Sequence, residues 1–160
     1  PVIMPDVNKI ANGDFEYLSH VTNINKYGWN FSVLSGVEEE PQDVCYLEKH
    51  SGKDNSYGVV IKTGGYLSTA VDCIYEGQIS ILEFDAKTDA KNGVAIVRYR
   101  DTSGNTLSSD KIDLIAGEDF NRYSVDVNPP KDSYSILIQF YANDYDPSTT
   151  YLDNVSLMRK

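Results

Sequence analysis

Apolar and polar residues alternate along much of this chain, in short runs that turn residues separate. The alternation is clearest over residues 78–87, 94–100 and 134–141. A period of two puts every second side chain on one face, as in a strand that packs on a core and meets water on its other side. No stretch keeps the helical period over three turns. The pattern predicts strands over residues 7–16, 29–34, 44–50, 57–62, 66–73, 78–87, 94–100, 107–115, 122–127, 134–141 and 150–158.

Turn signals between these runs favour an antiparallel, all-β fold. SGKDN at residues 51–55 is a turn, and DTSGN at residues 101–105 is a hairpin-type turn. Many short strands at close spacing predict an antiparallel β-sandwich. A jelly roll fits best, because its first and last strands can lie side by side at one edge. The length of 160 residues suits one domain with a single core, so we expect residues 1–160 to form one module.

The same alternation predicts which side chains face outward. Phe84, Val97 and Ile138 belong to the inward sets of their strands, and a register error of one residue would invert the assignment. The plainest interpretation of the opposite face is a solvated surface with cross-strand ion pairs, such as Glu83 with Arg98. If the strands share a sheet, its outer face carries Tyr46, Glu48, Glu83, Asp85, Arg98, Arg100, Gln139 and Tyr141.

The last predicted strand, TYLDNVSLM at residues 150–158, places an acid among inward residues. At period two, Asp153 shares a face with Tyr151, Val155 and Leu157. A buried carboxylate is costly without a partner, so Asp153 needs a cation, several hydrogen-bond donors or a metal. Two hypotheses follow: an aspartate that accepts hydrogen bonds from nearby backbone amides, or a ligand of calcium.

Three short motifs lie near the two ends of the chain: NGDFE at residues 12–16, GW at residues 28–29, and YLDNVSL at residues 151–157. In their order and positions they resemble the carbohydrate-binding modules of the jelly-roll superfamily, especially the group of families 4, 9, 16 and 22. The resemblance covers the whole chain in layout and only these motifs in letters.

The resemblance implies that a glycan chain binds across a concave sheet face. Aromatic rings would stack on the apolar faces of the sugars, while polar and charged side chains would bond the hydroxyl groups. On this interpretation the outward set of the sheet becomes the ligand site. The predicted ligand-binding residues are Tyr46, Glu83, Arg98, Arg100, Gln139 and Tyr141.

The resemblance also implies a structural calcium ion that ties the first strand, a loop and the last strand together. Asp153 would anchor the site, and Glu16 is the expected second carboxylate, with Asp14 as its alternate. Calcium takes six to eight oxygen ligands, so the SGKDN turn would supply carbonyl groups. The ion would serve stability and not catalysis.

Two aromatic residues and the two cysteines keep alternative interpretations. Trp29 packs in the core or an edge, or it is a stacking platform for a sugar. Tyr145 flanks a groove or covers an edge. Cys45 and Cys73 form a disulfide in a secreted protein, or they are two reduced, buried thiols.

The charge balance excludes some partners. A formal net charge of −10 argues against nucleic acid and anionic membrane surfaces, which reward basic patches. It suits a secreted protein with a neutral ligand, and 12 tyrosines suit partly wet binding surfaces such as sugar-binding grooves. Because the first residue is Pro1, we expect a module cut from a longer protein. We expect it to be a monomer joined covalently to catalytic or cell-surface domains.

These observations favour a non-catalytic module that binds a plant cell-wall β-glycan, such as β-glucan or xylan, and targets an attached enzyme. Arg98 and Arg100 leave room for an acidic sugar such as a uronate. One alternative is a structural or adhesion jelly roll of a cell surface or virion. Another is a small glycoside-active enzyme that uses paired carboxylates. The chain carries no serine-hydrolase elbow, phosphate-binding loop or dinucleotide fingerprint.

Overall fold

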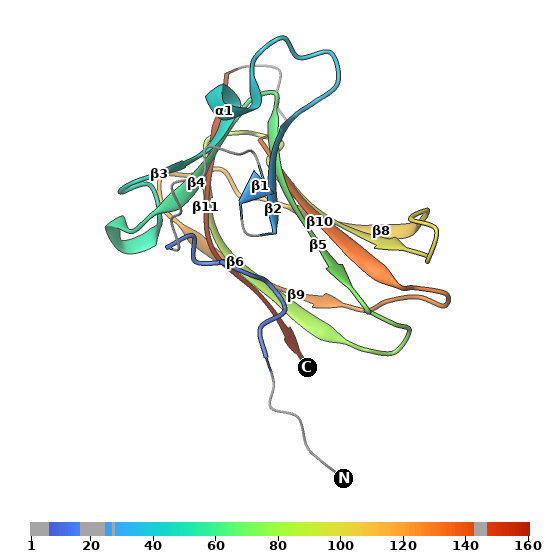
Figure 1. Ribbon diagram of the computed structural model, residues 1–160. Coiled ribbons are helices and arrows are strands. Elements are labelled where there is room, and N and C mark those ends of the chain that lie inside the picture. The colour runs from blue at the N-terminus through green and yellow to red at the C-terminus, as the bar shows by residue number, and fades with distance from the viewer. Residues whose placement is uncertain (1–6, 17–24, 27, 143–146) are drawn as a thin grey trace.

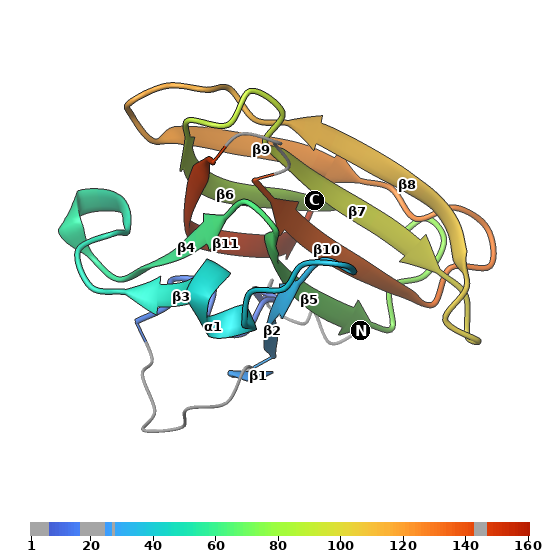
Figure 2. The same ribbon diagram turned by 90° about the horizontal axis from the view of Figure 1, so that it is seen from above.

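Two antiparallel sheets face each other across one apolar core in the computed structural model, which describes residues 7–16, 25–26, 28–142 and 147–160 (Figure 1). We call them sheet A and sheet B. Figure 2 shows the two layers from above. In spatial order, sheet A contains β1 (Asn25–Lys26), β2 (Trp29–Val33), β5 (Gly65–Asp72), β10 (Ser135–Tyr141), β7 (Val94–Arg100) and β8 (Thr106–Asp113).

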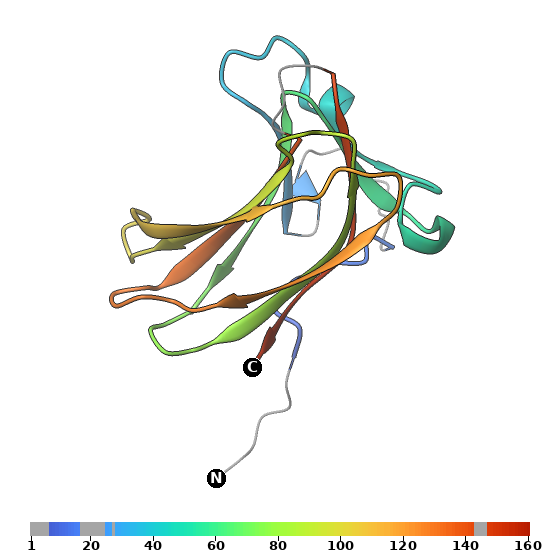
Figure 3. The same cartoon turned by 180° about the vertical axis from the view of Figure 1, so that it is seen from behind.

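Sheet B has five strands, and two short helical elements lie beside it. The helix α1 (Pro41–Val44) precedes its edge strand, and a 3₁₀ turn (Lys53–Asn55) forms part of the SGKDN turn. Figure 3 shows from behind the chain that crosses from β8 in sheet A to β9 in sheet B. In spatial order, sheet B contains β3 (Cys45–Glu48), β4 (Gly58–Lys62), β11 (Thr149–Arg159), β6 (Ser80–Thr88) and β9 (Asn121–Val127).

The predicted all-β sandwich of jelly-roll type is confirmed, and the alternation of the sequence explains its core. Phe84 on β6, Val97 on β7 and Ile138 on β10 are fully buried between the sheets. Their neighbours along each strand point to the opposite side, because side chains alternate across a strand. No helix in the described part of the chain has the length and apolar character needed to cross a membrane.

Trp29 belongs to the core and not to the surface. Its side chain is fully buried, and its Nε1–H donates to the carbonyl oxygen of Ala11 at 2.8 Å. The ring packs against Phe15 and Phe140, with centroid distances of 5.2 and 6.4 Å. The packing interpretation of the GW motif is therefore confirmed. Tyr145 lies outside the described residues.

A β-bulge in β11 changes the face that the sequence assigned to Asp153. The pairing of β11 with β6 shifts between Asp153 and Ser156, and Asn154 has a φ of 51°. Before the bulge Leu152 is the core residue, and after it Val155 is. An extra residue in one strand reverses the alternation, so the prediction that Asp153 points into the core was wrong. Its carboxylate lies on the outer side of sheet B, covered by the 52–57 loop.

The N-terminal segment, residues 7–16, runs beside β11. It does not form the strand that the sequence predicted there. Lys9 donates its backbone N–H to the Leu157 carbonyl at 2.9 Å, and Val155 donates to the Gly13 carbonyl at 2.8 Å. Pairing between β4 and β11 covers only Thr149 to Leu152, so the segment takes the edge that β4 leaves. β11 is consequently central in sheet B, not at an edge as predicted.

The two cysteines are not bridged. Cys45 is buried in the core, and Cys73 is exposed after the end of β5. Burial raises the pKa of the Cys45 thiol to about 12. Of the two alternatives left open by the sequence, the disulfide is therefore wrong, and the alternative of buried thiols holds for Cys45 alone.

Replacing Gly13 with alanine should destabilise the fold. A Cβ atom at this position would lie 1.9 Å from the Val155 carbonyl oxygen, so the N-terminal segment would have to move away from β11. We expect a loss of about 1–3 kcal/mol in the free energy of unfolding, measured by chemical denaturation. Gly117→Ala is the control, because nothing lies within 4 Å of its Cβ position and its backbone is not left-handed. Equal stabilities of the two variants would contradict the close-contact argument.

Candidate functional site

The six predicted ligand residues divide between the two sheets. Arg98 and Arg100 lie on β7, and Gln139 and Tyr141 lie on β10, all in sheet A. The other two, Tyr46 and Glu83, lie on β3 and β6 in sheet B. The premise that one sheet carries all six is therefore wrong. Periodicity assigned each of these six residues to the correct face of its own strand. The outer faces of the two sheets, however, lie on opposite sides of the sandwich.

Register fixes the four residues of sheet A on its outer face. Gln139 pairs with Ile96 and Leu137 pairs with Arg98 in the antiparallel ladder between β10 and β7. Directly opposed residues point to the same side, so each row of the ladder has one orientation. The intervening residues, among them Ile138, are buried in the core. The remaining side chains must therefore point away from it.

These side chains form a connected cluster, which we call the sheet A cluster: Tyr66, Arg98, Gln139 and Tyr141. The Nε–H of Arg98 donates to Oε1 of Gln139 at 2.6 Å. The Tyr66 and Tyr141 rings stack at a centroid distance of 5.3 Å and an interplanar angle of 25°. Burial raises the pKa of Tyr141, and hydrogen bonds with Arg98 and Gln139 offset part of that rise. The rings and the polar groups are thus held together by contacts within the cluster.

Tyr66 was missed at the level of sequence. It is the second residue of β5 and lies directly opposite Tyr141 in the ladder. The signal was the buried Leu67 beside it, which sends Tyr66 to the outer face. The pairing of β5 with β10 was the missing information.

Tyr46 and Glu83 have partners of their own on sheet B. The Lys62 ammonium lies over the Tyr46 ring, 5.7 Å from its centroid. The Glu83 carboxylate lies 3.8 Å from the Arg122 guanidinium, so the ion pair predicted between Glu83 and Arg98 does not form. These contacts stabilise sheet B, and the sheet A cluster lies on the other side of the sandwich.

Asp153 is held by donors from the 52–57 loop. Its Oδ2 accepts from the Lys53 backbone N–H and the Ser56 hydroxyl, each at 2.9 Å, and its Oδ1 accepts from the Asn154 N–H at 2.8 Å. The side chain is almost fully buried, with 1% of its surface exposed. This geometry matches the hypothesis of an aspartate bonded to nearby amides, and three donors satisfy only part of a carboxylate's capacity.

The predicted second ligand of calcium reaches the same loop. Glu16 Oε1 accepts from the Tyr57 backbone N–H at 3.0 Å. Burial raises the pKa of Asp153, its hydrogen bonds lower it, and the Glu16 charge raises it further. The two carboxylates are thus close enough to repel each other. Asp14 instead accepts the Glu16 N–H at 3.2 Å and is exposed.

The oxygen chemistry of this pair fits calcium, with loop carbonyls needed to complete the ligand set. No group of three or more histidine, cysteine, aspartate or glutamate side chains suited to a metal occurs in the described part of the chain. Two carboxylates from opposite ends of the chain meeting at one loop are nevertheless the arrangement that the sequence predicted. The metal itself stays a prediction.

A second buried carboxylate, Asp85, lies opposite Asp153 in register. Arg122 and Lys53 approach it at 3.4 and 3.8 Å, and Asn154 Nδ2 donates to it at 2.8 Å. Asn154 is the left-handed residue of the bulge. The Asp85 carboxylate therefore stabilises the bulge that turns Asp153 toward the 52–57 loop.

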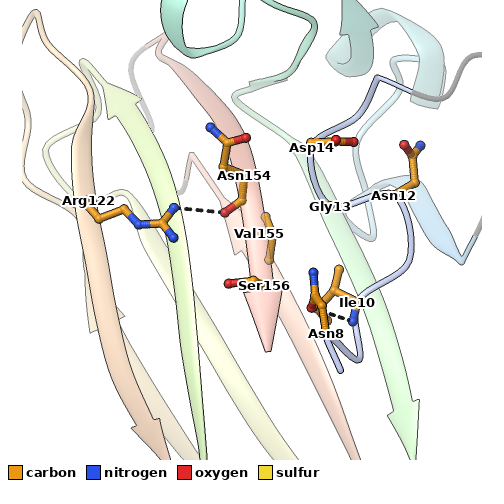
Figure 4. Close-up of a pocket in the computed structure, with 9 residues that line it drawn as sticks. All are labelled: Asn8, Ile10, Asn12, Gly13, Asp14, Arg122, Asn154, Val155 and Ser156. Carbon is orange, nitrogen blue, oxygen red and sulfur yellow. Dashed lines mark hydrogen bonds between the residues drawn. The ribbon is translucent and has the colours of Figure 1, made fainter. Parts of the chain in front are cut away.

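A pocket of about 370 Å³ opens between the N-terminal segment and β11 (Figure 4). Arg122 crosses one side of it and donates to the Asn154 carbonyl at 3.1 Å. The lining has no aromatic ring on which a sugar could stack, unlike the sheet A cluster. It consists of Asn8, Ile10, Asn12, Gly13, Asp14, Arg122, Asn154, Val155 and Ser156.

No protein-family model matches the chain, and no curated protein matches it. Several solved structures do match the chain in fold. The xylan-binding domain CBM22-1 of Paenibacillus barcinonensis Xyn10C has a TM-score of 0.64 and 12% sequence identity, and the match covers 99% of each chain. TmCBM61, solved in complex with β-1,4-galactotriose, has a TM-score of 0.58 and 14% identity, over 96% of this chain and 99% of that one.

A viral protein shares the fold as well. The enzymatically active domain of tailspike protein 4 of bacteriophage CBA120 has a TM-score of 0.65 and 21% identity over 94% of this chain. The chain spans about a fifth of that protein's length, because the match covers 21% of it. Together the likenesses confirm, at the level of fold, the predicted resemblance to jelly-roll carbohydrate-binding modules.

Asp153 should make the metal-free protein more stable as the pH falls. Its pKa in the folded state is raised, so the folded state binds a proton at a higher pH than the unfolded state does. In chelator, wild type should therefore gain stability relative to Asp153→Asn as the pH decreases from neutrality toward the unfolded-state pKa of about 4. The measurement is urea denaturation at a series of pH values. Asp126→Asn, which changes an exposed carboxylate, should follow wild type. Parallel profiles for wild type and Asp153→Asn would contradict the prediction.

Proposed function

We propose that this chain is a non-catalytic module that binds a polysaccharide along the outer face of sheet A. The observation that carries the proposal is the stacked pair Tyr66–Tyr141 beside the hydrogen-bonded pair Arg98–Gln139. A sugar ring presents an apolar C–H face and a rim of hydroxyl groups. Rings and fixed polar groups side by side match both.

The rigidity of the cluster supports a binding role. Its members come from the adjacent strands β5, β10 and β7, whose backbones are fixed by continuous ladders. Because Arg98 is already bonded to Gln139, a ligand would meet ordered donors and would not have to immobilise them. Preorganisation of this kind preserves affinity on an open face.

We further propose a β-linked glycan such as a β-glucan or a xylan as the ligand class. Supporting this, similar structures include a xylan-binding domain and a module solved with β-1,4-galactotriose. In this proposal the module is secreted and directs an attached enzyme to its polysaccharide. The acidic surface, with a net charge of −10, is compatible with that role and with a monomer.

An adhesion role is the second candidate. The fold of this chain also occurs as one portion of a longer phage tailspike protein, whose solved domain is enzymatically active, so this likeness is compatible with an adhesion role without favouring it over the first candidate. The two candidates share the sugar-binding face and differ in the neighbouring domains. A catalytic neighbour would favour the first, and adhesin or virion domains would favour the second.

Loss of one ring should weaken glycan binding. Titration of wild type against the best ligand from a polysaccharide screen should give micromolar affinity, about −8 kcal/mol. Tyr141→Ala and Tyr66→Ala should each cost about 1–3 kcal/mol, because each removes half of the stacked pair. The same incubations should release no reducing ends.

Tyr46→Ala is the matched control for these variants. It removes a tyrosine from the outer face of sheet B, on the other side of the sandwich. It should bind like wild type, with melting temperature as the control for folding. If Tyr46→Ala loses binding while folded Tyr141→Ala retains it, the ligand lies on sheet B and the proposed site is wrong.

We also propose that calcium binds between Asp153 and Glu16 at the 52–57 loop. The support is the meeting of these two carboxylates from opposite ends of the chain, where a divalent cation would relieve their repulsion. The ion would join the N-terminal segment, the loop and β11. Because it would bind only the folded state, it would stabilise the protein by mass action.

Chelation should lower the melting temperature without abolishing the fold. At calcium concentrations a hundredfold above the dissociation constant the stabilisation is about 2.7 kcal/mol. Glu16→Gln and Asp153→Asn should remove this response, and Asp14→Asn should retain it. The measurement is thermal unfolding with calcium and with chelator. An unchanged curve, in protein shown to start calcium-loaded, would rule the site out.

A further inference from the structure

Two arginines on the outer face of sheet A have no acidic partner among the described residues. Arg98 and Arg100 are successive outward residues of β7, and no ion pair joins either guanidinium to a carboxylate among the residues that the structure describes. The chain has 24 acidic and 14 basic residues, so acids are plentiful. Arg122, on the other sheet, shows the usual outcome: it pairs with both Glu83 and Asp85.

Arg100 is unsatisfied in a second respect. Its Nε atom is shielded from solvent and has no hydrogen-bond acceptor in the described part of the chain. A buried donor without an acceptor costs free energy, and the cost is larger for a charged group. A change of side-chain torsions that exposed this edge of the guanidinium to an anionic ligand would relieve that cost.

Both arginines adjoin the sheet A cluster. Arg98 belongs to it through Gln139 and Tyr141. Arg100 lies one row farther along the same face, opposite Ser135, and Arg98 lies opposite Leu137. On β8, Ser109 is opposite Arg98 and Thr106 is opposite Arg100, so neutral side chains flank the pair on that side. Asp72 is two strands from Arg100 in its row, about 10 Å away at the usual strand spacing.

We infer that the glycan recognised on this face carries carboxylates, and that Arg98 and Arg100 bind a uronate residue of it. This inference rests on the proposed function and specifies its substrate class. A guanidinium offers a planar fork of donors that matches a carboxylate, and such charge-assisted bonds are stronger than bonds to neutral hydroxyls. The stacked tyrosines beside the arginines select a ligand that also has an apolar ring face, which a free inorganic anion lacks.

The net charge of the whole protein narrows the class of anionic ligand further. A net charge of −10 repels polyanions at long range, so attraction must come from local contacts. A uronate glycan carries at most one charge on each sugar and supplies ring contacts as well. Dense polyphosphates would meet the repulsion without the compensating stacking.

The experiment compares polymers that differ only at the carboxylate. Four uronate polysaccharides serve as probes: glucuronan, glucuronoxylan, alginate and polygalacturonate. Each is titrated before and after reduction of its carboxyl groups to primary alcohols. The proteins are wild type, Arg98→Gln, Arg100→Gln and Lys87→Gln. The last removes one positive charge from the outer face of sheet B and is the charge-matched control. Circular dichroism and thermal unfolding verify that each variant is folded.

Wild type and Lys87→Gln should bind at least one native polymer about tenfold or more tightly than its reduced form. Arg100→Gln should lower that ratio, because it removes one of the two guanidinium groups, and binding of the native polymer should fall more than binding of the reduced one. Arg98→Gln should lower the ratio and also weaken binding of the reduced form, because Arg98 holds Gln139 in place. Equal binding of native and reduced polymers by wild type would overturn the inference and leave the proposed function standing. Failure to bind any polysaccharide, neutral or acidic, would overturn both.

Discussion

The structure depends on one irregularity in its central strand of sheet B. The bulge at Asn154 lets Leu152 and Val155 both enter the core, although they are three residues apart. It leaves Asp153 outside the core, where the 52–57 loop covers it and donates to it. It also presents the Val155 amide to the Gly13 carbonyl, and thereby docks the N-terminal segment. One inserted residue therefore joins a loop and both ends of the chain.

The three strands β5, β10 and β7 of the other sheet pair regularly, and regularity is what their proposed role needs. β10 pairs without a break with β5 and β7, so the side chains on its outer face stand in straight rows. Rows of this kind allow Tyr141 to stack on Tyr66 on one side while Arg98 bonds Gln139 on the other. The sandwich thus separates two tasks: sheet B joins the chain ends, and sheet A displays an ordered surface.

The sequence could predict the strands and their faces, because alternation is a local property. The inward sets around Phe84, Val97 and Ile138 were predicted correctly for that reason. Assignment of a strand to a sheet depends on long-range pairing, which periodicity does not encode. Tyr46 and Glu83 were therefore grouped with residues that lie on the opposite side.

The same distinction explains the remaining differences. The bulge at Asn154 adds a single residue to the strand and leaves the composition of the stretch unchanged. The sequence therefore gives no sign that the alternation is interrupted, and Asp153 was assigned to the core. The approach of NGDFE to Asp153 was predicted from the jelly-roll topology, which can place the first and last strands side by side, and it is found at Glu16. The alternation places Tyr66 on the outer face, but the sequence does not show which residue of a neighbouring strand lies beside it. Its significance depends on Tyr141, which is far from it along the chain.

The two cysteines differ in exposure, so one of them can be labelled selectively for spectroscopy. Cys45 is enclosed in the core and its thiol is hard to ionise, so it should be inert to alkylating reagents in the folded protein. Cys73 is exposed directly after β5, the strand that carries Tyr66. A maleimide dye would therefore label one known position without any substitution. Its fluorescence would report events at the end of sheet A in the unmodified sequence.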